Sequence, residues 1–145
     1  MSVLEITDDK ARIDVDRVHA WLAQSYWAAD MSRETFERAI AGSHCVTAWR
    51  DGVQLGFARA VTDRATYAYI TDVWVDETAR CQGIARAMVG WLVARPEYRA
   101  MRRITLQTAD AHGVYAALGF EPVLGPERWM EIPSAQARAM IEGER

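Results

Sequence analysis

The segment that most constrains the fold lies in the middle of the chain, where a strand pattern passes through a single glycine into a helix pattern. Residues 65–75 are rich in tyrosine, isoleucine, threonine, valine and tryptophan, which favour a strand. A polar loop at 76–82 leads to Gly83, and a helix pattern runs from there to the Arg95-Pro96 pair, where proline stops it. A helix start exposes unpaired N–H groups at the positive end of its dipole. This junction therefore predicts an anion site suited to a phosphate or pyrophosphate.

Glycine alone does not decide the matter, because an ordinary loop before a crossover helix would show the same pattern. Neither the dinucleotide motif G-x-G-x-x-G nor the nucleotide motif G-x-x-x-x-G-K-[ST] is present, so neither of those phosphate-binding folds is favoured. Charge supports the anion site. Residues 79–103 contain six arginines and one glutamate, which give this segment a charge of +5. The whole chain has a net charge of −3, so the remaining residues carry −8. An acidic chain also disfavours nucleic acid as a partner.

The rest of the sequence predicts an α/β (α+β) protein with one mixed, mostly antiparallel sheet of six to seven strands and helices on both faces. We expect strands at 3–7, 45–50, 53–61, 65–75, 103–108, 120–123 and 128–132, and helices at 14–27, 32–42, 84–95, 111–118 and 134–142. A βαβ crossover joins Val75 to Ile104. With 145 residues, 50% of them hydrophobic, the chain fits one domain, 1–145, whose tail, 133–145, forms a loosely packed helix.

The cysteines and the N-terminus indicate the compartment. Cys45 and Cys81 form no CxxC and no zinc spacing, which predicts two free thiols in a reducing cytoplasm and no metal site. Residues 1–14 carry acids where a signal peptide needs basic residues. No apolar stretch approaches the ~18–20 residues needed to span a bilayer. We expect a soluble cytoplasmic protein with no membrane contact.

Two motifs resemble those of the GNAT superfamily of acyl-CoA N-acyltransferases. Residues 80–85, Arg-Cys-Gln-Gly-Ile-Ala, match its [QR]-x-x-G-x-[GA] signature between the fourth strand and the following helix. Residues 108–120, from Thr-Ala-Asp-Ala to Leu-Gly-Phe, resemble the downstream pattern N-x-x-A-x-x-L-Y-x-x-x-G-F. Thr108 replaces the usual asparagine, which puts a side-chain amide contact there in doubt. The element order also resembles that of the family over roughly residues 3–132.

The resemblance implies that acetyl-CoA lies where the fourth and fifth strands splay apart. The backbone of Val73 and Val75 would pair with the pantetheine arm like an added strand. Backbone N–H groups of residues 82–86 would hold the pyrophosphate, with charge-assisted bonds from arginine side chains. The residues that the resemblance assigns to acetyl-CoA are Val73, Trp74, Val75, Arg80, Gln82, Gly83, Ile84, Ala85, Arg86, Thr108, Ala111 and Tyr115.

The same resemblance gives three candidate catalytic groups. Tyr115 matches the tyrosine that protonates or hydrogen-bonds the leaving thiolate, although a tyrosine at this helical spacing also fits core packing. The backbone N–H of Val73 matches the donor to the oxyanion. An ammonium must lose a proton before it attacks the thioester, and Asp72, beside the splay, is a candidate base. Asp110 and His112 are alternative bases, although Asp110 equally fits a helix cap.

The acceptor side leaves two alternatives open. Substrate contacts are expected from Tyr26, Trp27 and Tyr69. Ring faces together with Asp30 would bind a cationic amine, although Trp27 alone fits a core position equally well. Arg59 and Arg64 would instead select an acceptor that carries a carboxylate. The acidic charge outside residues 79–103 favours the cation.

These patterns predict an N-acetyltransferase that moves an acetyl group from acetyl-CoA to a primary amine of a small molecule or a peptide, by direct transfer in a ternary complex. A non-catalytic acyl-CoA-binding module is the alternative, and a different α/β phosphate-ligand protein is a third. Because many relatives pair through their terminal strands, the resemblance also implies a homodimer.

Overall fold

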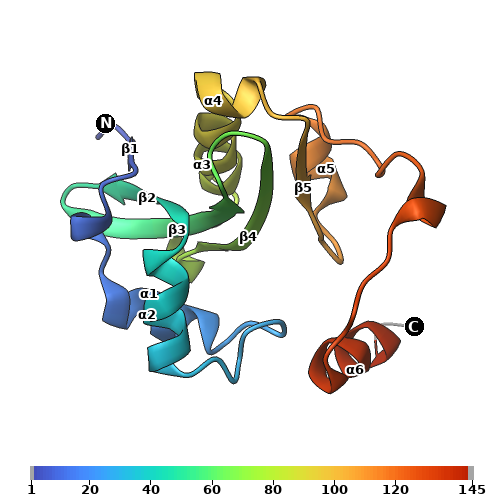
Figure 1. Ribbon diagram of the computed structural model, residues 1–145. Coiled ribbons are helices and arrows are strands. Elements are labelled where there is room, and N and C mark those ends of the chain that lie inside the picture. The colour runs from blue at the N-terminus through green and yellow to red at the C-terminus, as the bar shows by residue number, and fades with distance from the viewer. Residues whose placement is uncertain (1, 144–145) are drawn as a thin grey trace.

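One open sheet organises the protein, whose computed structural model describes residues 2–143 (Figure 1). Its five strands lie in the order of the sequence: β1 (Glu5–Thr7), β2 (His44–Arg50), β3 (Val53–Thr62), β4 (Tyr67–Val75) and β5 (Arg103–Leu106). Neighbours from β1 to β4 are antiparallel, whereas β4 and β5 are parallel. The parallel pair requires a crossover, and the chain from Val75 to β5 supplies it, as predicted.

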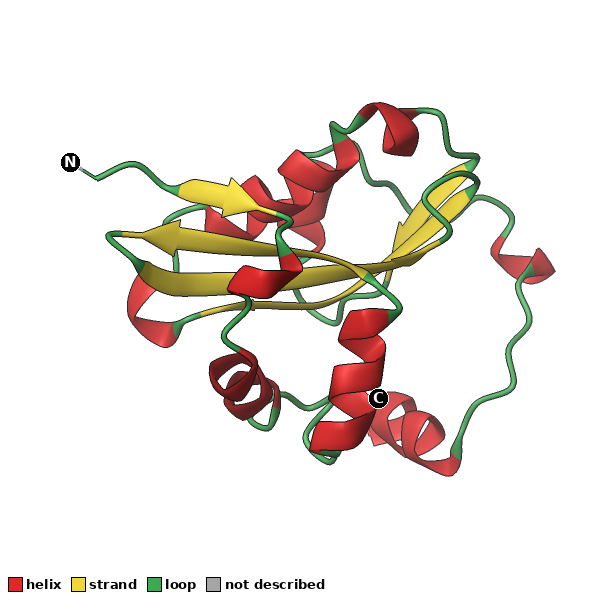
Figure 2. Ribbon diagram, turned by 60° about the vertical axis from the view of Figure 1, so that its left-hand side comes forward, coloured by secondary structure: helices red, strands yellow, loops and turns green. Residues whose placement is uncertain are grey.

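The helices lie on both faces of the sheet (Figure 2). They are α1 (Val15–Leu22), α2 (Arg33–Ala41), α3 (Ile84–Val93), α4 (Pro96–Arg99), α5 (His112–Ala116) and α6 (Ala135–Gly143). The predicted caps are present on the first two, because the Asp14 carboxylate accepts from the N–H of Arg17 and the Ser32 hydroxyl accepts from the N–H of Thr35. Helix α1 ends at Leu22, earlier than expected, and turns fill the chain before α2.

Two buried clusters follow from the alternation of side chains along the strands. Val46 and Ala58 face α3, in a cluster with Met88, Val89 and Leu92. The residues just before them on β2 and β3 face α1 and α2, in a second cluster whose members include Val18, Leu22, Phe36, Cys45 and Phe57. Each face of the sheet is therefore covered, which fixes the register of the strands that carry the site.

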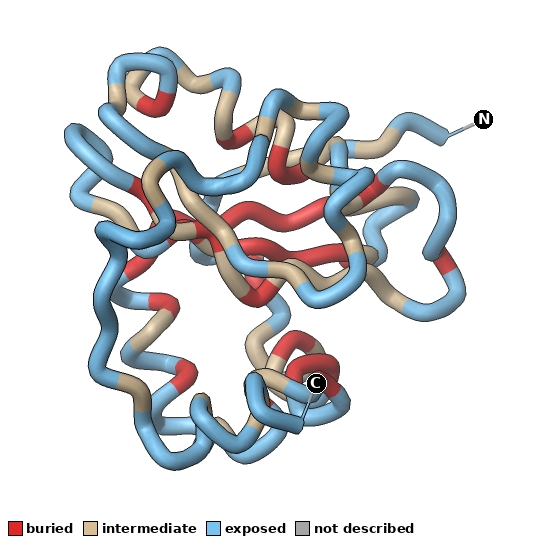
Figure 3. Tube along the Cα trace, turned by 90° about the vertical axis from the view of Figure 1, so that its right-hand side faces the viewer, coloured by how far each residue is buried: buried red, intermediate tan, exposed pale blue. Residues whose placement is uncertain are grey.

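The predicted terminal hairpin was wrong, so the sheet has five strands and not six to seven. Residues 120–132 contain one short 3-10 helix, Pro126–Arg128, and otherwise run as loop. Prolines at 122, 126 and 133 explain this, because each removes a backbone donor that a strand ladder would use. The segment is exposed along most of its length (Figure 3), and Met130 and Ile132 are 95% and 101% exposed. Helix α6 follows it and buries no residue.

Candidate active site

Strands β4 and β5 part after four residue pairs. Their pairing ends at Ile70 opposite Leu106, whereas β4 continues to Val75. Over the described residues, no strand pairs with this edge of β4 beyond Ile70 (Figure 1). The splay that the sequence predicts is therefore present. It leaves a row of backbone N–H and C=O groups that an extended ligand could pair with.

A β-bulge bends β4 at the start of this free edge. Arg59 pairs with Thr71 and Phe57 with Trp74, so Asp72 and Val73 together oppose the single residue between those two on β3. Asp72 has a φ of +55°, in the left-handed region. A residue other than glycine costs about 1–3 kcal/mol there and needs its surroundings to hold it. The bulge therefore sets the direction of the backbone at Val73.

Asp72 is a buried anion with two donors. It is 4% exposed, and its carboxylate accepts from the indole Nε1 of Trp27 at 2.8 Å and from the Nε of Arg59 at 2.6 Å. The Arg59 guanidinium also donates to the Ser43 hydroxyl at 3.1 Å. This network joins the α1–α2 loop, the bulge and strand β3. It also pairs Arg59, one of the two arginines considered for an anionic acceptor, with Asp72.

The loop before α3 has the backbone shape of an anion site. Cys81 and Gly83 both have positive φ, 62° and 77°, and Gly83 is the N-terminal cap of α3. A side chain at Gly83 would meet no atom within 4 Å, so a ligand can approach the backbone there. The first helical bond runs from the N–H of Ala87 to the carbonyl of Gly83, which leaves the N–H groups of 84–86 at the open end of the helix.

Two arginines hold side-chain contacts at this loop. The Arg80 Nε donates to the carbonyl of Val75 at 3.1 Å, and its guanidinium lies over the Trp74 ring at 4.8 Å. Arg50 donates from Nη1 to the Gln82 side-chain oxygen at 2.8 Å, while its Nε is buried with no hydrogen-bond partner. Sequence reasoning missed Arg50, because it ends β2, far from either motif, and only the fold brings it beside Gln82.

Tyr115 lies on α5, half-buried beside Phe120. Burial raises the pKa of its hydroxyl above the ordinary value, and the nearby charge of Asp110 raises the pKa further. The phenol is therefore protonated at neutral pH and able to donate. Thr108 acts locally, because its hydroxyl accepts from the N–H of Ala111 at 2.9 Å in the turn that leads into α5.

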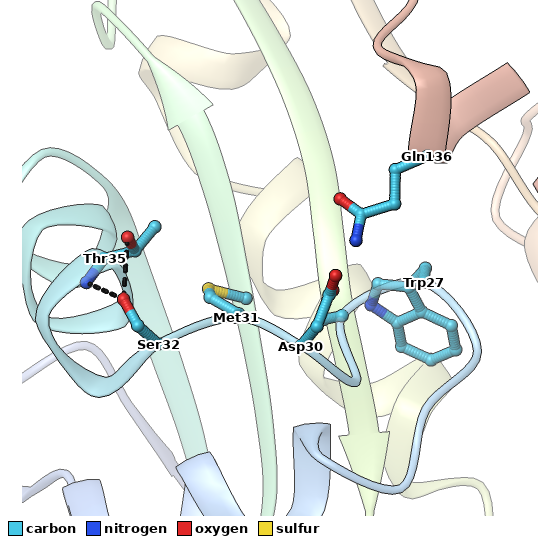
Figure 4. A pocket seen from close by; sticks show the side chains of 7 residues that line it. Trp27, Asp30, Met31, Ser32, Thr35 and Gln136 are labelled. Carbon is cyan, nitrogen blue, oxygen red and sulfur yellow. Dashed lines mark hydrogen bonds between the residues drawn. The ribbon is translucent and has the colours of Figure 1, made fainter.

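The acceptor side is built from aromatic rings and one open pocket. Tyr26 and Trp27 meet edge to face with their ring centres 5.0 Å apart, and Trp27 lies 6.1 Å from Trp74. A pocket of about 390 Å³ is lined by Trp27, Ala28, Asp30, Met31, Ser32, Thr35 and Gln136. In Figure 4, Asp30 from the α1–α2 loop and Gln136 from α6 point toward one another across it. Tyr69 is half-buried on β4, and burial raises the pKa of its hydroxyl.

Two other charged candidates, Arg64 and His112, do not join the residues described above. Arg64 belongs to the β3–β4 turn, where it pairs with Glu97 at 3.6 Å and lines a separate pocket with Asp8 and His44. His112 is exposed at the start of α5. Of the two arginines that the sequence offered for an anionic acceptor, Arg59 is paired with the buried Asp72, and Arg64 lies outside the pocket lined by Trp27 and Asp30.

Comparison with known proteins decides the family. The sequence model of the Acetyltransferase (GNAT) family matches residues 11–120. A crystal structure of a candidate GNAT acetyltransferase from Xanthomonas campestris pv. campestris is 36% identical, covers 94% of this chain and 96% of that one, and gives a TM-score of 0.88. The chain belongs to the GNAT acetyltransferase family.

Two further matches, both to acetyltransferases by description, extend over nearly the whole chain. A candidate acetyltransferase from Gibberella zeae is 26% identical over 161 residues, which cover 95% of this chain and 88% of that protein. A candidate acetyltransferase from Clostridium acetobutylicum, solved with acetyl-CoA, is 18% identical, covers 92% of this chain and 96% of that one, and has a TM-score of 0.64. At that identity the second match shows the fold.

Among residues 2–143, no three His, Cys, Asp or Glu side chains are grouped as metal ligands. In the same range, no helix combines the length and the apolar character that crossing a membrane requires. Both cysteines are free, Cys45 buried and Cys81 exposed in the loop before α3, and burial raises the pKa of the Cys45 thiol to about 11.

Proposed function

We propose that the protein is an N-acetyltransferase that uses acetyl-CoA and transfers the acetyl group directly to a primary amine in a ternary complex. The observation that carries this proposal is the junction of two open backbone elements. The free edge of β4, residues 71–75, runs into the loop whose Gly83 opens α3, and Arg80 holds the two together through the Val75 carbonyl. A ligand that is a strand-like amide chain at one end and a pyrophosphate at the other fits both elements.

Family membership supports this cosubstrate, and the Clostridium acetobutylicum relative was crystallised with acetyl-CoA. We assign the pyrophosphate to the backbone of residues 82–86 and the thioester end to the region of Val73 and Tyr115. The N–H of Val73 stabilises negative charge on the thioester oxygen, and the Tyr115 hydroxyl donates a proton to the departing sulfur. Thiol release from acetyl-CoA with a library of amines tests the activity. Binding of acetyl-CoA without turnover on any amine would favour an acyl-CoA-binding module instead.

Arg86 provides a test of the phosphate loop, because it is exposed at the start of α3 and forms no ion pair among the described residues. We expect Arg86→Gln to weaken acetyl-CoA binding about tenfold, since a charge-assisted hydrogen bond contributes about 1.5–3 kcal/mol, and to reduce the salt dependence of binding. Isothermal titration calorimetry at two salt concentrations measures both. Arg99→Gln is the matched control, because Arg99 is exposed beyond the far end of α3. Equal losses in the two variants would contradict the assignment.

Tyr115→Phe tests proton donation to the leaving group. We expect kcat to fall about 10²- to 10⁴-fold, the usual contribution of general acid catalysis, while the dissociation constant of acetyl-CoA changes little. Because burial raises the pKa of Tyr115, the wild-type rate should hold through neutral pH and fall only at alkaline pH, where the phenol ionises. This alkaline limb should be absent from the variant. A variant with wild-type kcat on a good acceptor would remove Tyr115 from the reaction.

For the acceptor, we propose a cationic amine that enters the 390 Å³ pocket, with Asp30 as its counter-charge and Tyr26, Trp27 and Tyr69 as the aromatic surface toward the thioester. The charges support this choice. Arg59 forms an ion pair with Asp72, and Arg64 forms one with Glu97. Asp30, in contrast, forms no ion pair among residues 2–143. A peptide amine and a small polyamine present the same ammonium, so the acceptor library should contain both.

Asp30→Asn should raise KM for cationic amines several-fold and leave kcat and acetyl-CoA binding nearly unchanged, because it removes attraction without touching the reacting groups. Steady-state kinetics with a cationic and a neutral-side-chain amine measures this effect. Glu34→Gln, the same charge change on the exposed face of α2, is the control. An equal rise in KM for both variants would attribute the effect to net charge and not to the pocket.

We also propose that the protein is a cytoplasmic homodimer. Support for the compartment is the exposed free thiol of Cys81. Support for the dimer is the apolar C-terminal segment, where Leu124, Trp129, Met130 and Ile132 are exposed, together with the short edge strand β5. Light scattering after gel filtration should give twice the monomer mass of 16.3 kDa, and Met130→Glu/Ile132→Glu should give the monomer. A wild-type monomer at micromolar concentration would overturn this proposal.

A further inference from the structure

The network of Trp27, Asp72 and Arg59 has a consequence for the reaction, and the inference rests on the proposed function. Asp72 is at once the bulge residue of β4, a residue with left-handed backbone, and a carboxylate whose side chain is only 2% exposed. From these observations we infer that Asp72 is a positioning residue. It fixes the position of the Val73 N–H relative to the α1–α2 loop, which carries Trp27. It does not take a proton from the amine.

Burial makes the base role unsuitable. A base must reach the amine directly or through one water, and a side chain with 2% exposure has no open path to either. Its two hydrogen bonds come from Arg59 at 2.6 Å and Trp27 at 2.8 Å, both from within the protein. Each oxygen of the carboxylate therefore already accepts a hydrogen bond from the protein itself, which leaves neither one directed toward an amine.

The same contacts suit positioning. Two charge-assisted hydrogen bonds to one buried carboxylate are strong enough to hold the left-handed backbone at Asp72. Val73 follows directly in the bulge, so the orientation of its peptide N–H depends on the backbone at Asp72. If the carboxylate lost its partners, the bulge would be free to relax and the N–H would turn away from its target.

The other end of the network reaches the acceptor pocket. Trp27, which donates to Asp72, also lines the 390 Å³ pocket and packs against Tyr26 and Trp74. One carboxylate therefore fixes both the donor for the thioester oxygen and a wall of the amine site. Holding two reacting groups at the correct separation contributes several kcal/mol to catalysis, and small displacements reduce the rate strongly.

Trp27→Phe is the sharpest test, because it keeps an aromatic side chain at this position, leaves the carboxylate in place and removes the N–H donor. We expect kcat to fall about tenfold and the amine KM to rise, with acetyl-CoA affinity unchanged. Trp49→Phe is the matched control, since its indole also donates one hydrogen bond, at 2.7 Å to Thr47, and Trp49 does not line the acceptor pocket. Its kinetics should equal those of the wild type.

Asp72→Asn separates positioning from proton transfer, because asparagine tolerates the left-handed conformation and keeps one acceptor oxygen. We expect kcat to fall about 10- to 100-fold while the acid limb of the kcat/KM profile stays at its wild-type pH. Loss of that limb, together with wild-type kinetics for Trp27→Phe, would make Asp72 the base and overturn the inference. Loss of thermal stability with unchanged kcat for the folded enzyme would show a merely structural role and overturn it as well.

A readout that needs no turnover keeps this inference distinct from the proposed function. In ¹H–¹⁵N spectra, Arg59→Gln should shift both the Trp27 indole N–H and the Val73 amide, although neither residue is altered. Shifts at neither group would overturn the coupling even in an active enzyme. Absence of turnover in the wild type would instead count against the acetyltransferase proposal, and the shifts would still decide whether the network holds the bulge.

Discussion

The site depends on how early β4 and β5 part. Four residue pairs hold the parallel strands together, and β4 then continues for five residues with no strand beside it. If β5 had followed β4 to Val75, every backbone group along that edge would be paired and no extended ligand could add to the sheet. The bulge at Asp72 and Val73 adds to the separation by bending β4 at the point where the pairing stops. The opening is therefore a property of backbone pairing, and side chains only line it.

Charge then divides the opening between two ligands. Backbone N–H groups and Arg80 and Arg86 gather at the α3 end, which suits a polyanion. At the opposite side, Asp30 is the charged residue that lines the pocket of the α1–α2 loop. Arg59, which is linked to the pocket residue Trp27 through Asp72, is neutralised by that carboxylate. The anion-binding groups and the acidic pocket are therefore different groups, as the proposed cosubstrate and the proposed cationic acceptor require.

Local patterns explain which features could be read from the sequence. The loop before α3 could be predicted because its signals are adjacent: a strand, a glycine and a helix within about twenty residues. The antiparallel meander followed from the Asp51-Gly52 turn and from alternation in β2 and β3, and Asp51 and Gly52 do adopt the positive φ that such a turn needs. The predicted terminal hairpin is absent although its apolar residues alternate, because the missing N–H groups of three prolines prevent a strand ladder.

The parts that could not be predicted are contacts between distant positions. Trp27, Asp72 and Arg59 are separated by 13 to 45 residues, and nothing in their local sequence links them. Arg50 likewise reaches Gln82 across 32 residues. A pattern can place Asp72 beside the splay, but only the fold shows that the bulge turns its carboxylate into the core, where a guanidinium and an indole hold it. The same bulge residue that looks like a base in the sequence is, in three dimensions, the element that fixes where its neighbour's N–H points. Strain of this kind persists where surrounding contacts over-determine it, and here those contacts come from Trp27 in the α1–α2 loop and from Arg59 on β3.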